Sequence, residues 1–372
     1  MQNQLPHIAF MNTISGWGGG EKWHFDYAVL LAEKGFTISF ICAKNSVLHE
    51  RLLAYPNIKL HFLKSTNFSV FYIGKLQKLR NFLKKNQVDQ IWINFPKDLK
   101  IGALAAHQAK VKTIGYVRGI PKPIKNSFTN RWLFQKYVTN IIANSLATKK
   151  SILANNANLF PEDKIKVLYN WVAMETSHTN KKKNDVFTLG FVGRLAPEKN
   201  PLFLVRLAEI LKQKGISFQF LIAGVGSLET DLRKQIHEKE VQNYFQLLGF
   251  CEDIEAVFSQ LDILIVPSVW EGFGYVVVEA AKYQVPSLAF KTSSFLEIIQ
   301  NEKTGKLFDM NDANAMAETI IQLQKQPEKV EELGKQAKEF CSKYFSKEVV
   351  VNEFTNYVLQ LHQANQSPLL SK

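Results

Sequence analysis

The chain has 372 residues, of which 46% are hydrophobic and 21% charged, as in ordinary globular proteins, and this length predicts two domains of about 180 residues each. Its three cysteines, Cys42, Cys251 and Cys341, lie far apart without the spacing of metal ligands, which argues against a disulfide framework and a zinc site. No apolar run approaches the roughly 20 residues that span a bilayer, and the amino terminus lacks a signal-peptide core, so we expect a cytoplasmic protein.

The positive charge lies almost entirely in the first half of the chain. The formal net charge is +13; residues 1–180 carry 24 Lys and Arg against 9 Asp and Glu, whereas the remainder carries 22 against 24. Such an asymmetry predicts a basic surface that meets an acidic partner, either nucleic acid or an anionic membrane.

The candidate for that surface is the segment FYIGKLQKLRNFLKKNQ, which begins at Phe71. Leu76, Leu79 and Leu83 fall on one side of a predicted helix, with cations spread around them, as in helices that lie on membranes. The alternative is a surface helix that packs through its leucines and whose basic side is only solvated. The cations of the segment are Lys75, Lys78, Arg80, Lys84 and Lys85.

The first predicted strand is His7–Asn12, and the glycine loop Ser15–Gly20 follows it and opens a helix near Glu21. The glycines allow the backbone to approach a phosphate or a sugar closely, although they lack the GxGxxG arrangement of dinucleotide-binding folds. Further strands alternate with helical patterns, which predicts a doubly wound α/β domain. These strands are Thr37–Cys42, Lys59–Phe62, Val88–Asn94, Lys112–Val117, Asn140–Ala143 and Ile165–Leu168.

A polar, basic segment without apolar periodicity, Met174–Asp185, is predicted to be the linker between the domains. Beyond it, the strand Phe187–Val192 ends at Gly193, and Arg194 and Lys199 flank a turn before the next helix. Two cations at the end of a parallel strand suit a diphosphate, because Arg offers a planar fork and Lys a point charge. In the alternative, both are solvated turn residues. Further on, Gly224 lies in a turn where amides could face a nucleotide or only make the chain reverse.

The stretch LDILIVPSVWEGFGYVVVEAAKYQVPSLAF, residues 261–290, predicts a buried strand, a loop, a helix and a second buried strand. Parallel sheets bind ligands at the carboxyl ends of their strands, which places the loop Glu271–Gly274 at a ligand. The carboxylates of Glu271 and Glu279 can accept hydrogen bonds from sugar hydroxyls, and the glycines let amides approach an anion. The alternative is an ordinary surface loop with two solvated acids.

Five motifs occur in the second half of the chain: GRLAPEKN, AGVGSLET, LLGFCEDIEAVF, PSVWEGFGYVVVEAA and TGKLF. In their order and spacing they resemble the retaining, nucleotide-sugar-dependent glycosyltransferases of family 4, which have the GT-B fold. The first half resembles this family more weakly, through SGWGGGEKWHFDYAVLLAEKGF, IIANSLATKKSI and VLYNWV.

The resemblance implies two Rossmann-like, doubly wound α/β domains that face each other across a cleft. The first, residues 1–173, is expected to bind the acceptor. After the linker 174–185, residues 186–345 are expected to bind the nucleotide sugar. A helix within 346–372 is expected to cross back to the first domain.

The resemblance also implies transfer of a sugar, with retention at the anomeric carbon, from a nucleotide diphosphate sugar to a saccharide or glycolipid acceptor. Lipopolysaccharide, capsule or other cell-surface glycans are the expected products. Arg194 and Lys199 would neutralise the leaving diphosphate, Glu271 would bind the donor sugar, and Glu279 would bind the ribose. No DxD pair occurs, so we expect neither a metal nor another cofactor. The expected catalytic residues are Arg194, Lys199 and Glu271, and the expected donor-binding residues are Gly19, Gly20, Gly193, Arg194, Lys199, Gly224, Glu271, Gly272, Phe273, Gly274 and Glu279.

Two positions depart from the family pattern. Arg118, in YVRGIPKPIK, stands where the family often has a histidine, and it cannot act as a base because it stays charged. As the acceptor-side candidate, it could hold an acidic acceptor or the diphosphate, or only anchor its loop. Ser293 and Ser294 stand where the family usually has a glycine pair before a glutamate, which here is Glu297.

Other functions remain to be distinguished. An epimerase or hydrolase of nucleotide sugars can use the same fold, and a fold alone does not decide between them. A nucleic-acid-binding protein would use the basic half, but no recognisable binding module is present, so we expect no nucleic acid partner. The basic half instead favours a lipid-linked acceptor and a peripheral position on the inner face of the cytoplasmic membrane.

Overall fold

The computed structural model describes residues 5–154, 157–175 and 186–366, and these form two compact α/β units. One unit contains the residues up to Asn170 together with those from Val350 onward, and the other runs from Trp171 to Val349. The predicted linker 174–185 lies outside the described residues from position 176 onward.

The first unit is built on a seven-stranded sheet in the order β3-β2-β1-β4-β5-β6-β7, in which all neighbouring strands are parallel. In the register, Ile8 of β1 lies between Ile38 of β2 and Gln90 of β4. The central strands are buried throughout, as continuous apolar sequences predict for a parallel sheet. The strands are β1 (Ile8–Met11), β2 (Ile38–Cys42), β3 (Lys59–Phe62), β4 (Gln90–Ile93), β5 (Thr113–Arg118), β6 (Asn140–Ala143) and β7 (Ile165–Val167).

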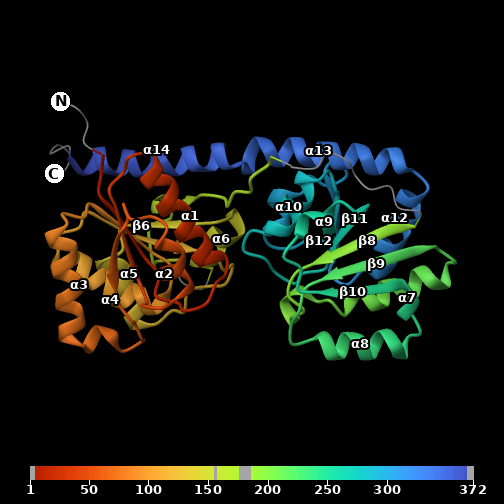
Figure 1. The fold of residues 1–372 in the computed structure, drawn as a ribbon, viewed down its shortest axis with the longest axis horizontal. Coiled ribbons are helices and arrows are strands. Elements are labelled where there is room, and N and C mark those ends of the chain that lie inside the picture. The colour runs from red at the N-terminus through yellow and green to blue at the C-terminus, as the bar shows by residue number, and fades with distance from the viewer. Residues whose placement is uncertain (1–4, 155–156, 176–185, 367–372) are drawn as a thin grey trace. The chain divides into compact units, whose positions relative to one another are not determined.

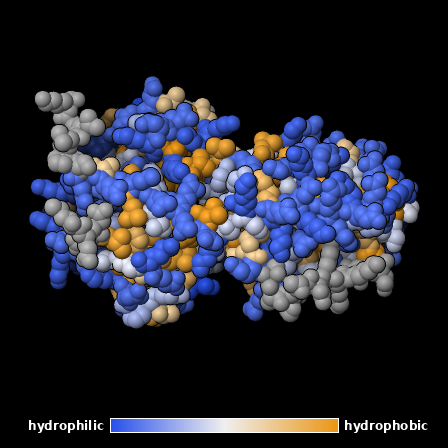
Figure 2. Space-filling view, turned by 90° about the horizontal axis from the view of Figure 1, so that it is seen from above, coloured by the Kyte–Doolittle hydropathy of each residue, from blue (hydrophilic) through white to orange (hydrophobic). Residues whose placement is uncertain are grey.

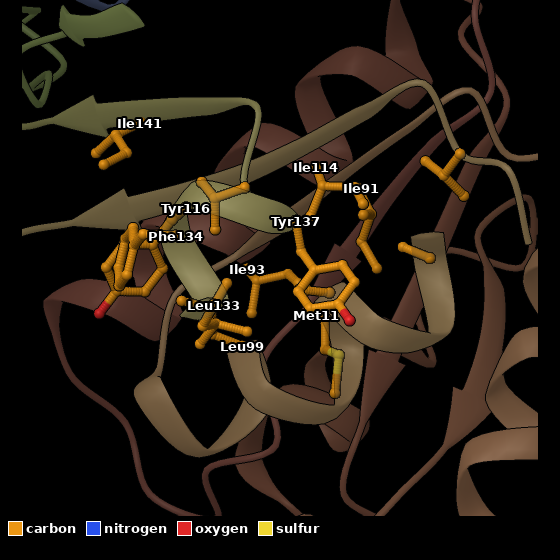
Figure 3. Close-up of a cluster of buried hydrophobic side chains, with 14 of the residues drawn as sticks. Met11, Ile91, Ile93, Leu99, Ile114, Tyr116, Leu133, Phe134, Tyr137 and Ile141 are labelled. Carbon is orange, nitrogen blue, oxygen red and sulfur yellow. The ribbon is translucent and has the colours of Figure 1, made fainter. Parts of the chain in front are cut away.

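Helices cover both faces of this sheet (Figure 1). On one face α1 packs with the last helix, α14, whereas α3 packs beside α4 on the other face. The apolar side chains of the second face form one core, in which Met11 and Ile93 of the sheet lie close to Leu99 of α4 (Figure 3). The helices are α1 (Gly19–Glu33), α2 (Val47–Leu52), α3 (Ile73–Lys85), α4 (Pro96–Gln108), α5 (Phe128–Lys136), α6 (Leu146–Leu153) and α14 (Lys347–Gln366).

The last helix, α14, is held on the first unit by aromatic packing. The ring of Phe354 in α14 lies 4.6 Å from the ring of Tyr27 and 5.6 Å from that of Trp92. The side-chain amide of Gln90 also donates a hydrogen bond to the Val358 carbonyl at 2.7 Å. These contacts join the last helix to β4 and α1.

The second unit has a six-stranded parallel sheet in the order β10-β9-β8-β11-β12-β13. The chain order reverses at β8, because β9 lies on one side of it and β11 on the other. Open α/β sheets bind ligands beside such a reversal, at the carboxyl ends of the strands. The strands are β8 (Phe187–Val192), β9 (Phe218–Ala223), β10 (Phe245–Gly249), β11 (Ile263–Val266), β12 (Ser287–Phe290) and β13 (Gly305–Phe308).

Helices also cover this second sheet, with α7 packed against α12 and α10 against α13. The prediction of two doubly wound α/β domains is therefore confirmed, and β3, β6 and β8 have the predicted bounds. The helices of the second unit are α7 (Phe203–Gln213), α8 (Glu229–Glu238), α9 (Ile254–Phe258), α10 (Tyr275–Lys282), α11 (Phe295–Ile298), α12 (Ala313–Gln324) and α13 (Pro327–Phe345).

The basic helix differs from its prediction in one respect. α3 begins at Ile73, after a short 3-10 helix at Ser69–Phe71, and not at Phe71. Leu79 and Leu83 are fully buried in the first core, so the leucine side of the helix belongs to the interior. A membrane could therefore meet only the basic side of α3 and its start.

No helix among the described residues combines the length and the apolar character that a membrane span requires. The face shown in Figure 2 is mainly hydrophilic, with hydrophobic residues in small groups. Such scattered apolar residues are normal, because polar atoms are too few to cover a folded protein.

Candidate functional site

The candidate site lies in the second unit, where the chain order of the sheet reverses. β8 and β11 are parallel neighbours, with Leu189 opposite Ile263, so their carboxyl ends lie side by side. β8 leads into the turn Arg194–Lys199, and β11 leads into the loop Glu271–Gly274. The two stretches from which we predict ligand binding therefore meet at one edge of the sheet.

A partly buried ion pair joins these two stretches. The Lys199 ammonium donates to Glu271 Oε1, and the two side chains are only 21% and 13% exposed. The Ser268 hydroxyl donates to the same carboxylate oxygen at 3.2 Å. Because partial burial weakens solvent screening, the two charges hold each other in place. Neither Ser268 nor the pairing itself was singled out by the sequence patterns.

Arg194 has a different environment, because its side chain is 74% exposed. Its Nη2 donates to Glu198 Oε1 at 2.7 Å. Glu198 lies on the 3-10 helix Pro197–Lys199, and its carbonyl oxygen accepts a hydrogen bond from the Val269 amide at 2.9 Å. An exposed ion pair is weak, so the guanidinium can leave Glu198 for a phosphate.

Two glycines bring the ends of β8 and β9 into backbone contact. Gly224 has φ of +143°, and a Cβ there would lie 1.9 Å from the Gly193 carbonyl oxygen. The Gly193 amide donates to the Ala223 carbonyl at 2.9 Å, and the Gly224 amide donates to the Gly249 carbonyl at 2.7 Å. Both amides are used within the protein, so the contribution of these glycines is the close approach of the two turns.

The loop before α10 has two unused amides. Gly272 and Gly274 are buried, and within the described part of the chain their N–H groups donate to no other group. Gly274 has φ of +86°, and a Cβ there would lie 2.9 Å from the Phe295 ring. The Phe273 ring is buried and packs 5.5 Å from the Phe345 ring, so it anchors the loop. Buried amides need acceptors, and at a helix amino end they attract anions.

The segment after β12 supports the same loop. Ser293 has φ of +47°, the left-handed conformation that glycine adopts most easily, so a glycine-like backbone occurs here without glycine. The Ser294 hydroxyl donates to the Glu271 carbonyl at 3.4 Å, and the Thr292 hydroxyl donates to the Val269 carbonyl at 3.0 Å.

Glu279 lies on α10, one turn before Tyr283, in an acidic neighbourhood. Burial raises the pKa of the Tyr283 hydroxyl to about 12, with further contributions from the charge and hydrogen bond of Glu255 and the charges of Asp253 and Glu279. The phenol therefore stays protonated and can donate a hydrogen bond at neutral pH. The two glutamates of the predicted site thus have different neighbours.

In the first unit, the predicted residues lie at the carboxyl edge of the other sheet. Gly19 and Gly20 form the start of α1, where a Cβ on Gly20 would lie 2.7 Å from Asn94 Oδ1. Arg118 ends β5, and its Nη2 donates to the Lys122 carbonyl at 2.6 Å. This contact anchors the loop after β5, which is one of the three roles considered for Arg118.

Asp98 fixes the chain that follows β1, although the sequence patterns did not indicate it. Asp98 is fully buried and accepts hydrogen bonds from the Thr13 amide at 2.8 Å, the Thr13 hydroxyl at 2.6 Å and the Ser65 hydroxyl. Thr13 and Ser65 are 85 and 33 residues from Asp98, so no local pattern could have revealed the cluster.

The chemistry of the second-unit site suits a ligand with both phosphate and hydroxyl groups. The Lys199 ammonium and the amides of Gly272 and Gly274 can bind an anion, and the Glu271 carboxylate can accept from a hydroxyl. Throughout the described ranges, no three His, Cys, Asp or Glu side chains come together as metal ligands do.

Comparison with known proteins gives matches over most of the chain. Residues 17–176 match the family described as Glycosyltransferase Family 4, and residues 174–340 match Glycosyl transferases group 1. The chain is 24% identical, over 86% of its length and 87% of the relative, to the Escherichia coli UDP-Gal:alpha-D-GlcNAc-diphosphoundecaprenol alpha-1,3-galactosyltransferase. It is 28% identical, over 85% of its length and 90% of the relative, to the capsular polysaccharide biosynthesis glycosyltransferase CapM of Staphylococcus aureus.

A solved structure shows the same fold. HepE of Anabaena, in complex with UDP and glucose, matches with a TM-score of 0.78 at 20% identity, over 95% of this chain and 100% of that one. At this level of identity, the likeness shows the fold alone, in which each unit has a parallel sheet covered by helices.

Proposed function

The chain belongs to the glycosyltransferases of family 4, a retaining family with the GT-B fold, and on this premise we propose that it makes a cell-surface glycan. It would transfer a sugar from a nucleotide diphosphate sugar to a saccharide or lipid-linked acceptor, keeping the configuration of the anomeric carbon. The relatives named for galactosyl transfer to a diphosphoundecaprenol-linked sugar and for capsule synthesis support this setting.

The observation that carries the proposal is the pairing of Lys199 with Glu271 beside two unused buried amides. The diphosphate of the donor needs cationic and N–H groups, whereas its sugar needs hydrogen-bond acceptors. Both kinds of group lie at the carboxyl edge of one parallel sheet, beside its reversal, where α/β folds bind nucleotides.

In the proposed reaction, the bond between the anomeric carbon and the diphosphate oxygen breaks, and its electron pair stays on the diphosphate. The acceptor hydroxyl oxygen forms the new bond to the anomeric carbon, and its proton passes to the departing diphosphate. Lys199 and Arg194 neutralise this developing charge, which is electrostatic stabilisation of the kind that often dominates catalysis. The amides of Gly272 and Gly274 hold the phosphates. Glu271 accepts from donor sugar hydroxyls, and Glu279 accepts from the ribose.

The donor nucleotide is proposed to be UDP. The E. coli relative is named for UDP-Gal, and HepE was crystallised with UDP and glucose. The second unit would bind this donor, and the first unit would bind the acceptor, with Arg118 as a candidate contact. The basic first unit would also place the enzyme on an anionic membrane surface on the cytoplasmic side.

The test begins with a thermal-shift screen of nucleoside diphosphates and nucleotide sugars, since a ligand of the folded state raises Tm. The best donor is then incubated with saccharide and lipid-linked acceptors, and the product is characterised by mass and by the configuration of the new bond. An α-linked product from an α-linked donor is expected. Free sugar without glycosylated product would instead indicate a hydrolase. A nucleotide sugar in which one carbon of the sugar has changed its configuration would indicate an epimerase.

A further inference from the structure

The start of α3 presents large apolar side chains to water. We call this group, which consists of Phe68, Phe71, Tyr72 and Ile73, the apolar tip. Their exposed fractions are 68%, 77%, 57% and 68%. A single exposed apolar residue is ordinary, but four within six consecutive residues form a patch, and patches of this kind mark interaction surfaces.

A hydrogen-bonded turn directs the apolar tip outward. Ser69 is fully buried, and its hydroxyl accepts a hydrogen bond from the Thr66 amide at 2.7 Å. The amides of Phe71 and Tyr72 donate to the carbonyls of Phe68 and Ser69 at 3.0 and 3.1 Å. This 3-10 turn also packs against α4, so the exposed side chains project from a segment that is fixed to the first unit.

Lysines lie beside the apolar tip. The Lys75 ammonium lies 5.2 Å from the centre of the Tyr72 ring and donates to the Lys64 carbonyl at 3.1 Å. Together with Lys75 and Lys78, part of the tip lines a hollow of about 460 Å³. Residues 51–88 contain eight Lys or Arg and no Asp or Glu, so no acid in this stretch neutralises the cations.

We propose that the apolar tip inserts into the interfacial layer of an anionic membrane, while the lysines around it bind the lipid headgroups. A protein partner is disfavoured because lysine is depleted in protein–protein interfaces. A membrane fits better, because lysines can bind the anionic headgroups while the neighbouring aromatic side chains contact the acyl chains. The leucine side of α3 takes no part, because Leu79 and Leu83 lie in the core. This inference rests on the proposed function and specifies which residues bind its membrane partner.

The test uses the full chain in vesicle sedimentation. The vesicles contain phosphatidylglycerol and phosphatidylethanolamine, or phosphatidylcholine alone, at low and at high salt. Three variants are compared with the wild type. The tip variant is Phe68→Ser, Phe71→Ser and Ile73→Ser; the charge variant is Lys75→Glu, Lys78→Glu, Lys84→Glu and Lys85→Glu; the control is Leu53→Ser, at a residue that is 64% exposed elsewhere on the first unit.

The wild type should bind the anionic vesicles, and part of this binding should survive high salt because insertion is apolar. The tip variant should bind at least about tenfold more weakly at both salt concentrations, since each lost apolar side chain removes interfacial burial. The charge variant should lose binding, and Leu53→Ser should bind as the wild type does. The wild type and the three variants should all show the same increase in Tm when UDP is added.

Equal binding by the tip variant and the wild type would overturn the proposal, as would a wild type that ignores anionic vesicles. The proposal would also be overturned if the wild type is dimeric in gel filtration and the tip variant is monomeric. The apolar tip would then be a contact between two copies of the chain. Failure of the proposed function has another signature: vesicle binding persists, but no nucleotide sugar donates to any acceptor.

Discussion

The Lys199 ammonium and the Glu271 carboxylate form a direct ion pair although they are 72 residues apart in the sequence. Lys199 follows β8 and Glu271 follows β11, so the pair exists only because these strands are neighbours in the sheet. Since both side chains are mostly buried, each depends on the other for neutralisation. The proposed catalytic role of this pair and the stability of the second unit are therefore expected to depend on the same contact.

Lys199→Ala is expected to lower kcat by about two to three orders of magnitude, as for loss of a preorganised charge. It should also lower Tm, because Glu271 is 13% exposed and loses its cation. Steady-state kinetics and thermal melting measure the two effects. Lys303→Ala, at an exposed lysine of the same unit, is the control. Near-wild-type turnover would remove Lys199 from the mechanism.

Arg194→Ala is expected to lower kcat by a similar factor of about two to three orders of magnitude but to leave Tm unchanged. The side chain is 74% exposed and pairs only with Glu198 among the described residues, so folding depends on it little. The same kinetic and melting experiments test this. A drop in Tm with unchanged kcat would contradict both parts of the prediction.

Gly224→Ala should destabilise the second unit and weaken nucleotide binding. The new Cβ would lie 1.9 Å from the Gly193 carbonyl, so the turns after β8 and β9 must separate. Gly215→Ala is a matched control, because Gly215 also has positive φ, at +70°, but has no atom within 4 Å of a Cβ. Gly224→Ala should lower Tm more than Gly215→Ala, because it adds a steric contact, and a φ less accessible to alanine, that Gly215→Ala lacks; equal losses would contradict the prediction.

Transfer activity should persist in excess EDTA. The expectation comes from the lack of a DxD pair in the sequence and from the cationic and amide groups that can neutralise the diphosphate. Initial rates with and without the chelator provide the measurement. Complete loss of activity that magnesium or manganese restores would show that a metal ion takes part.

Acid should destabilise the first unit through His24. Complete burial lowers the pKa of this imidazole to about 4 from its ordinary value of 6.5. Below pH 6.5 the unfolded chain therefore binds a proton that the folded chain does not, so stability is full above pH 6.5 and falls as pH decreases toward 4. The loss is about 3 kcal/mol when it is complete.

The variant His24→Phe separates this effect from general acid unfolding. The ring should keep its contacts with Phe10 and Phe40, at 5.7 and 6.5 Å, but has no proton to gain. Tm at pH 7.5 and pH 4.5 should differ less for this variant than for the wild type, and His107→Gln, at an exposed histidine, serves as control. Equal pH dependence of His24→Phe and the wild type would contradict the assignment.

The elements, the fold and the family were accessible from the sequence, and the family assignment is confirmed by matches to both halves. Short β-branched runs such as Ile263–Val266, ended by Pro267, are local signals of buried strands. The edge at which the candidate residues meet was also accessible, because parallel strands must end at the same edge. The assigned roles of Arg194, Lys199 and Glu271 remain predictions.

Only the tertiary structure decided how individual side chains are used. It pairs Lys199 rather than Arg194 with Glu271, and it buries Asp98 against Thr13 and Ser65. It also turns the leucines of α3 inward and leaves the apolar tip outside. Helical periodicity is the same whether an apolar side faces a core or a membrane, and partners far apart in the sequence meet only through strand order and helix rotation. Those depend on packing over the whole unit, which no local stretch of sequence contains.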